Sequence, residues 1–281
     1  MRILMFSWEY PPRSVGGLAQ HVQDLTNALA SQGHEVHLIT CGGQGLPVYD
    51  NIQGVQVHRV SPFSLSTPDF KTWILHLNLA MLEYTFTLLE NLEGKIDVVH
   101  NHDWLTAYAA RVVKHSRNVP LIATIHATEY GRNHGLHTDE QRYISDVEWW
   151  LTYEAWRVIV CSSYMEQELG RVFQLPKDKL RIIPNGVIPE NFTTDRVSPG
   201  FRTNYAHPDQ KIVFFVGRLV QEKGVQVLLE AMPKVLRYHP HTKLVIGGKG
   251  PNEHYLRQRA HELGISPSVY FTGYIDDATR N

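Results

Sequence analysis

Short runs of apolar and β-branched residues alternate along the chain with longer amphipathic segments. The short runs are typical of buried strands, and the longer segments repeat apolar residues at helical spacing. Strands that alternate with helices predict an α/β fold with a parallel sheet. The first series predicts strands at residues 2–7, 35–40, 55–60, 98–100, 121–125, 157–160 and 181–183, and helices at 18–32, 73–92, 104–115, 138–153 and 163–173.

This alternation is interrupted once. Residues 188–208 are rich in proline and polar residues and show little periodicity, which predicts a linker between two domains. A second series then predicts strands at 211–216, 243–246 and 269–272, and helices at 222–238 and 252–263. We therefore expect an N-terminal domain at residues 1–187 and a C-terminal domain at residues 209–281.

The second series contains few strands, and its last segment, residues 276–280, reads as the N-cap and first turn of a further helix. A sheet of three strands leaves an open edge and an uncovered apolar face. We therefore expect a truncated second domain. Because soluble monomers rarely expose large apolar patches, we also expect a homo-oligomer joined through residues beyond about Lys211.

Composition narrows the class of protein. A formal net charge of −1 over 281 residues lacks the basic excess of a nucleic-acid binder. The longest apolar segment, residues 73–92, is interrupted by polar residues such as His76 and Glu83, which predicts a core-facing helix and no membrane span. The only cysteines, Cys41 and Cys161, lie beside apolar runs, which predicts buried reduced thiols and a cytoplasmic location.

A candidate anion site follows the predicted strand at 211–216. That strand ends in Gly217-Arg218, and Lys223 lies at the start of the next predicted helix. Two cations beside the N–H groups of a helix N-terminus form an arrangement that binds a diphosphate. The alternative is an ordinary arginine at a strand end and a solvated helix lysine.

Polar motifs also follow four other predicted strands. They are Ser7-Trp8-Glu9-Tyr10-Pro11-Pro12 with Gly16-Gly17-Leu18, His100-Asn101-His102-Asp103-Trp104, His126-Ala127-Thr128-Glu129-Tyr130-Gly131-Arg132, and Pro184-Asn185-Gly186. Together with Gly217-Arg218 and Lys223, these motifs resemble the retaining GT-B glycosyltransferases of family 4, near the glycogen and starch synthases. The resemblance covers the whole chain in consistent order. It implies a GT-B fold with a complete N-terminal Rossmann-like domain and the first half of a C-terminal one.

The resemblance also implies catalytic roles. Gly16 and Gly17 would face the donor diphosphate and the transferred sugar, and His126 would contact that sugar. Arg218 and Lys223 would stabilise the charge that develops on the departing diphosphate. For a Gly-Gly pair by itself, the alternative is a plain turn between strand and helix. For His126, the alternative is a histidine at a strand end whose hydrogen bonds are all made within the protein.

Further residues would complete the site. Gly248, Gly273 and Tyr274 resemble the loops that flank the base and ribose of the donor. The acceptor side would be formed by Glu9, His102, Asp103, Glu129 and Arg132.

A metal site is the alternative interpretation of the histidine motif. His100 and His102 lie on one face of a strand end, which allows chelation, but no third ligand is evident. The resembled enzymes neutralise the leaving diphosphate with arginine and lysine, so we expect neither a metal nor another cofactor. We expect instead that Asp103 caps a helix beginning at Trp104.

The family also carries a pair of glutamates eight residues apart. This spacing occurs at Glu140 with Glu148 and at Glu222 with Glu230, but both pairs lie within predicted helices and lack the expected loop. We therefore expect the functional pair to be missing and the activity of this chain to be impaired or absent.

The function implied is transfer of a hexose, glucose by first choice, from a UDP- or ADP-linked donor to the hydroxyl of a sugar or other acceptor. GDP-mannose as donor and a non-catalytic binding module are the alternatives. An epimerase of this fold would need a carboxylate cluster that the sequence lacks, and a dehydrogenase would need a Gly-x-Gly-x-x-Gly motif after a strand.

Overall fold

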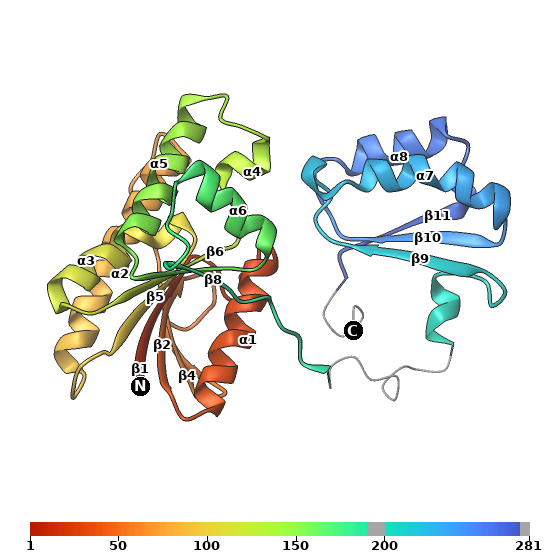
Figure 1. Ribbon diagram of the computed structural model, residues 1–281. Coiled ribbons are helices and arrows are strands. Elements are labelled where there is room, and N and C mark those ends of the chain that lie inside the picture. Colours follow the sequence, from red (N-terminus) through yellow and green to blue (C-terminus); the bar gives the residue numbers. More distant parts are fainter. Residues whose placement is uncertain (190–199, 276–281) are drawn as a thin grey trace. The chain divides into compact units, whose positions relative to one another are not determined.

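The computed structural model describes residues 1–189 and 200–275, and the chain divides into two compact units, Met1–Val187 and Ile188–Asn281 (Figure 1). Residues 190–199 of the predicted linker, and the helix start predicted at 276–280, lie outside the described residues. None of the helices within those ranges is long and apolar enough to cross a membrane.

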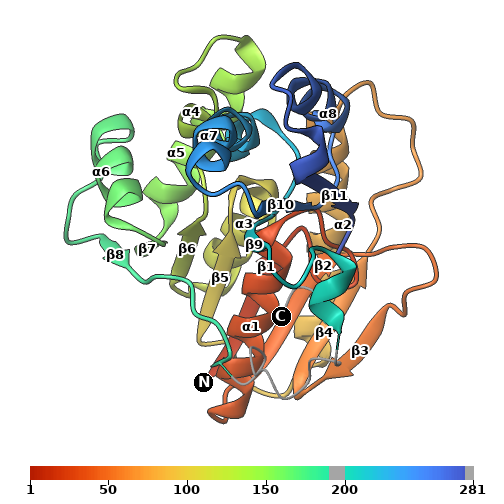
Figure 2. The same ribbon diagram turned by 90° about the vertical axis from the view of Figure 1, so that its right-hand side faces the viewer.

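The first unit is built on an eight-stranded sheet with the order β3-β4-β2-β1-β5-β6-β7-β8, which can be followed across Figure 2. The strands are β1 (Arg2–Ser7), β2 (Glu35–Cys41), β3 (Tyr49–Ile52), β4 (Val55–Val60), β5 (Val98–His102), β6 (Leu121–Ile125), β7 (Arg157–Val160) and β8 (Leu180–Ile182). All neighbouring pairs are parallel except β3 with β4. Every strand predicted for this unit is present.

Strand β3 was not predicted. It forms an antiparallel hairpin with β4 through Gln53 and Gly54, whose φ angles of 51° and 88° fit a tight hairpin turn. The strand lies at the edge of the sheet, and Tyr49 is 51% exposed. An edge strand does not need the continuous apolar run that identifies a buried one, so its sequence gives a weak signal.

Helices cover both faces of this sheet. They are α1 (Gly17–Ser31), α2 (Phe70–Asn91), α3 (Ala107–Arg117), α4 (Glu129–Asn133), α5 (Asp139–Glu154) and α6 (Ser163–Val172). Side chains of the central strand β1 alternate between the two faces, as strand geometry requires. Leu4 and Phe6 join a core with α2, α3 and α5, whereas Ile3 and Met5 pack with Val22 of α1 on the opposite face.

Helix ends follow local chemistry, with one correction. The Ser162 hydroxyl accepts a hydrogen bond from the Met165 amide and caps α6, and Gly33 has a φ of 84° after α1. The prediction that Asp103 caps a helix at Trp104 is wrong. Its side chain makes no cap bond there, because its carboxylate is used elsewhere, and a short 3-10 turn (Trp104–Thr106) precedes α3.

The second unit contains a three-stranded parallel sheet with the order β11-β10-β9. Its elements are β9 (Lys211–Val216), α7 (Val225–Tyr238), β10 (Thr242–Gly247), α8 (Glu253–Glu262) and β11 (Val269–Gly273). Helices α7 and α8 pack on one face of this sheet through residues such as Leu229 and Leu256 (Figure 1). Phe214, Val216 and Tyr270 are 48%, 42% and 43% exposed.

The predicted helix at 222–238 is shorter than expected. A 3-10 turn (Gln221–Lys223) comes first, and Gly224 with a φ of 69° separates it from α7. Lys223 therefore lies in the turn before the helix and not in the first helical turn.

Candidate functional site

The carboxyl ends of β1, β5 and β6 bring three of the predicted motifs of the first unit together. The strands are adjacent in the order β1-β5-β6, and His102 is paired with Thr124 near the end of β6. Residues that follow neighbouring parallel strands meet at one edge of the sheet, where open α/β sheets bind ligands. Glu9, Asp103 and His126 therefore lie at the same edge, although they are far apart in sequence.

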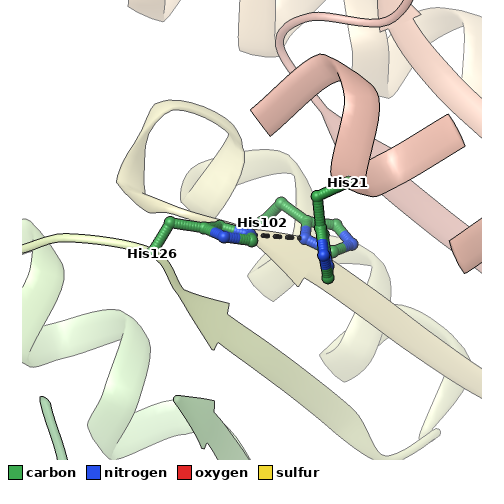
Figure 3. A group of neighbouring side chains, drawn as sticks. All are labelled: His21, His102 and His126. Carbon is green, nitrogen blue, oxygen red and sulfur yellow. Dashed lines mark hydrogen bonds between the residues drawn. The ribbon is translucent and has the colours of Figure 1, made fainter. Parts of the chain in front are cut away.

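Three histidines form the centre of this edge (Figure 3). His21 comes from the first turns of α1, His102 ends β5, and His126 follows β6. Nδ1 of His102 and Nε2 of His126 are hydrogen-bonded over 3.1 Å. The ring centroid of His21 lies 4.7 Å from that of His126 and 5.5 Å from that of His102.

These imidazoles are neutral at physiological pH. Burial lowers the pKa of His21 to about 4, and burial with the neighbouring histidines holds the pKa of His102 well below 6.5. Burial also lowers the pKa of His126, although Asp103 opposes this effect. The Nε2 atoms of His21 and His102 are buried and are unsatisfied by hydrogen-bond geometry within the described ranges, although Asn185 lies near enough to His21 to oppose the lowering of its pKa.

The trio could hold a metal ion or the hydroxyls of a sugar. One ligand atom from each histidine lies within 4.8 Å of the others, and neutral imidazole is the form that binds metals. His21 was not predicted as a site residue. It lies four residues after Gly17 and therefore on the same face of α1. This spacing is the sequence signal that could have placed His21 beside the glycine loop.

Asp103 fixes the position of His126. The backbone N–H of His126 donates to Oδ1 of Asp103 over 2.8 Å, and the Asn101 side-chain amide donates to the Asp103 carbonyl over 2.6 Å. Asp103 has φ 56° and ψ −178°, a backbone region that strongly favours glycine. This strained conformation, held by neighbouring hydrogen bonds, is typical of a functional site.

Glu9 supports the glycine loop. Its buried carboxylate accepts hydrogen bonds from the amides of Val15 and, over 3.2 Å, Gly16, while burial raises its pKa. Gly16 is the N-cap of α1 and Gly17 its first residue, and a Cβ added at either glycine would meet no atom within 4 Å. The loop therefore has open space beside the N-terminus of a helix, where an anion is favoured.

Glu129 and Arg132 belong to the short helix α4, with 3.8 Å between their charged atoms. The Glu129 amide donates to both carboxylate oxygens of Glu148, each over 3.0 Å. Glu148 is 1% exposed, and burial raises its pKa to about 8. Glu148 thus anchors α4 to α5, which is consistent with its exclusion as a functional glutamate at the sequence level.

Cys161 corrects the expectation of two buried thiols. Cys41 is buried, but Cys161 is only partly buried, and both are free. The Cys161 thiol donates to Oδ1 of Asn185 over 3.1 Å and lies 3.9 Å from Nδ1 of His126. The Pro-Asn-Gly motif after β8 therefore contacts the histidine edge through this cysteine.

In the second unit, three glycine loops meet at the carboxyl ends of the strands. The Gly248 amide donates to the Gly273 carbonyl over 2.7 Å, and the Gly217 amide donates to the Gly247 carbonyl over 3.0 Å. A Cβ at Gly248 would lie 1.9 Å from the Gly217 carbonyl oxygen, and Gly248 has a φ of 127°. Glycine is therefore required here for the close approach of two backbones.

The predicted phosphate-binding cations lie beside these loops. Arg218 and Lys223 are both exposed, and Nη2 of Arg218 is 3.9 Å from Oε1 of Glu222. Gly224 follows Lys223 and is the N-cap of α7. Tyr274, after β11, is 75% exposed. The second unit thus presents two cations next to a helix N-terminus, the features expected of a diphosphate site.

Comparisons with known proteins agree with both units. The model of Glycosyltransferase Family 4 matches residues 15–191, and that of Glycosyl transferases group 1 matches residues 200–280. An uncharacterized glycosyltransferase of Methanocaldococcus jannaschii is 40% identical over 283 residues, covering 99% of this chain and 71% of that protein. A glycogen synthase of Mycobacterium tuberculosis is 34% identical over 290 residues, covering 98% of this chain and 68% of that protein.

Solved structures show the same fold. Sucrose-phosphate synthase from Thermosynechococcus elongatus has a TM-score of 0.80 at 21% identity, covering 99% of this chain and 71% of that one. Anabaena HepE in complex with UDP and glucose has a TM-score of 0.72 at 15% identity, covering 100% and 71%. These likenesses identify the fold as GT-B, as the sequence predicted.

Proposed function

Because this chain belongs to Glycosyltransferase Family 4, we propose that it transfers a hexose from a nucleotide-sugar donor to an acceptor hydroxyl with retention of configuration. The observation that carries the proposal is the edge formed by neutral His21, His102 and His126 beside the open Gly16-Gly17 loop. A neutral imidazole has one nitrogen that donates and one that accepts a hydrogen bond, which suits the hydroxyls of a sugar.

The roles divide between the two units. In the second unit, Arg218 and Lys223 bind the donor diphosphate and stabilise its charge as it departs. Gly248, Gly273 and Tyr274 flank the base and ribose. In the first unit, His126 contacts the transferred sugar, and Asp103 holds the His126 backbone in place.

The donor we propose first is glucose linked to UDP or ADP, since one relative is named a glycogen synthase. GDP-mannose is the second candidate. We also propose that transfer needs no metal, because Arg218 and Lys223 supply the positive charge that the departing diphosphate requires.

The experiment measures donor binding by calorimetry and sugar transfer by product analysis, for UDP-glucose, ADP-glucose and GDP-mannose. His126→Ala is expected to reduce transfer at least tenfold while leaving nucleotide diphosphate binding intact. His254→Ala, an exposed histidine on α8, is the matched control. Donor binding without any transfer would agree with the impaired activity expected from the missing glutamate pair or with a non-catalytic binding module. Failure to bind any of the three donors would overturn the proposed function.

Metal dependence has its own test. Protein dialysed against a chelator is expected to retain its donor binding and transfer, with no zinc found by elemental analysis. Stoichiometric zinc that is lost together with activity in a His21→Ala variant would instead assign the histidine trio as a metal site.

A further inference from the structure

An open surface hollow of about 320 Å³ lies in the first unit, and none of the three histidines lines it. Its lining residues come from the loop after β1, from the segment before α2 and from the first turn of α2, and they are Trp8, Arg13, Thr67, Asp69, Phe70 and Trp73. The volume is at the lower end of the range for small-ligand pockets, about 300–1,000 Å³. Among these residues, only Trp8 belongs to one of the motifs that follow the predicted strands.

Aromatic rings form the walls. The rings of Phe70 and Trp73 are stacked, with centroids 5.8 Å apart and an angle of 10° between their planes. The ring of Trp8 meets Phe70 edge-on, with centroids 6.5 Å apart. Phe70 is 46% exposed, so these rings are not sealed within the core. An aromatic cluster that remains open to solvent offers flat apolar faces to a ligand.

Arg13 supplies a hydrogen-bond donor inside this aromatic cluster. Its guanidinium carbon lies 5.8 Å from the ring centroid of Trp8 and 5.9 Å from that of Trp73, so the side chain is held in place by both rings. One terminal nitrogen donates to the Gly42 carbonyl over 3.3 Å. The Nε atom is buried and has no partner in the part of the chain that the structure describes. This atom is closed to solvent, but the second terminal nitrogen of Arg13 makes no hydrogen bond within the described residues and is not among the buried atoms, so a ligand oxygen could bond there.

Asp69 supplies an acceptor in the same hollow. Its carboxylate accepts from the Thr72 amide over 2.8 Å, and this hydrogen bond lowers its pKa, so the group is an anion at neutral pH. The exposed carboxylate retains further lone pairs for hydroxyl donors. The Arg13 guanidinium and the Asp69 carboxylate have opposite charges, so the hollow favours a ligand without net charge that carries both donors and acceptors.

A pyranose ring has these properties, because its C–H groups form an apolar face and its hydroxyls surround that face. We propose that this hollow binds one ring of a neutral acceptor oligosaccharide, stacked on Trp8 or Trp73, with hydroxyls bonded to a terminal nitrogen of Arg13 and to Asp69. The proposal rests on the proposed function and adds the substrate class of the acceptor. It also accounts for the tryptophan at the start of the Trp-Glu-Tyr-Pro-Pro motif.

The test measures binding of maltoheptaose and of an α-linked mannotriose by calorimetry and by quenching of tryptophan fluorescence. At least one probe is expected to bind with millimolar affinity or better. Trp73→Ala is expected to weaken this binding about tenfold or more, and Phe70→Ala, at a more exposed position, provides a second variant if Trp73→Ala unfolds. Trp149→Ala on α5 is the matched control, because Trp149 is 46% exposed and stacks on Tyr153, outside the hollow.

The outcomes separate the two proposals. UDP or ADP binding that persists while neither oligosaccharide binds would overturn the acceptor site and leave the proposed function standing. Oligosaccharide binding with equal affinity in Trp73→Ala, Phe70→Ala and Trp149→Ala would place the ligand elsewhere and also overturn it. If the protein binds oligosaccharide but binds none of UDP, ADP and GDP, the result would count against the proposed transferase and not against this oligosaccharide site.

Discussion

The backbone N–H of His126 donates a hydrogen bond to Oδ1 of Asp103, over 2.8 Å and across 23 residues of sequence. This bond joins the motif that ends β5 to the motif that follows β6. It also explains why Asp103 does not cap the turn at Trp104, since its carboxylate faces the neighbouring strand end. Asp103 is thus a positioning residue for His126.

Removal of this acceptor should destabilise the first unit. Asp103→Ala leaves the His126 amide without its partner, and an unsatisfied buried group costs about 1–3 kcal/mol. Asp103→Asn keeps a carbonyl acceptor of the same size and adds no backbone strain beyond that of aspartate, so its cost should be less than about 1 kcal/mol. Urea unfolding monitored by tryptophan fluorescence compares the two variants. Equal stability of Asp103→Ala and the parent would contradict the role given to this bond.

The two cations of the second unit should bind nucleotide diphosphate. Arg218→Ala and Lys223→Ala each remove a charge-assisted hydrogen bond worth about 1.5–3 kcal/mol, which corresponds to tenfold or greater loss of affinity. Calorimetry with UDP and ADP measures the change. Lys234→Ala, an exposed lysine on α7, is the control and should bind as the parent does. Unchanged affinity in both test variants would remove these residues from the site.

Stability should fall in mild acid because of buried histidines. His58 is 3% exposed, and burial, with His37 nearby, lowers its pKa to about 4. The unfolded chain, with a histidine pKa of about 6.5, binds a proton between these values that the folded protein does not bind. The free energy of unfolding is therefore highest above pH 6.5 and falls as the pH is lowered toward 4. Each such histidine lowers it by about 2 kcal/mol between pH 7 and pH 5.

Comparison of two variants tests this dependence. His58→Gln should flatten the decline in unfolding free energy between pH 7 and pH 5, although it lowers stability at pH 7 through the loss of bonds to His37 and Tyr84. His254→Gln, at an exposed position, should leave the decline unchanged. A His58→Gln protein with the parent's pH profile would show that His58 titrates normally in the fold.

Gly248 should tolerate no side chain. A Cβ there would meet the Gly217 carbonyl oxygen at 1.9 Å, and the φ of 127° disfavours any other residue. Gly248→Ala should unfold or rearrange the loops at the strand ends and weaken UDP or ADP binding at least tenfold. Gly170→Ala is the matched control, because Gly170 lies in α6 with open space around it and alanine favours a helix by about 1 kcal/mol. A native-like Gly248→Ala protein in thermal unfolding and nucleotide binding would contradict this requirement.

Self-association through the second unit remains a prediction from the sequence. Phe214 and Val216 of β9 and Tyr270 of β11 are each more than 40% exposed, and burial of such side chains against a second copy would be favourable. Light scattering at tens of micromolar should show a dimer or larger species, and Phe214→Asp should dissociate it. Val227→Asp, at an exposed position on α7, should not. A monodisperse monomer of the parent chain would rule this association out.

Much of the fold could be predicted because its signals are local. A buried parallel strand such as residues 121–125 must be apolar on both faces, so it is visible without any neighbour. Strand β3 and helix α4 were missed because one is an exposed edge strand and the other is a single short helix. The break at Gly224 was missed because a glycine near the start of a predicted helix can lie either within the helix or at its N-cap.

The candidate site was predicted in part. His102 and His126 were identified from their positions after strands, but His21 was not, because a histidine within an amphipathic helix is usually unremarkable. Glu148 was set aside as a helix residue, and only the packing of α5 shows that it holds the Glu129 amide. Each missed residue acts through a contact distant in sequence.

The sequence by itself determined the alternation of strands and helices, the order of the motifs and the family, since all of these are encoded in runs of neighbouring residues. Only the tertiary structure decided which motifs meet. The sheet order β1-β5-β6 places His102 against His126 and Asp103 under the His126 amide. The physical reason is that strand pairing is set by packing across the whole sheet, and burial at the paired ends then fixes the charge state of the histidines.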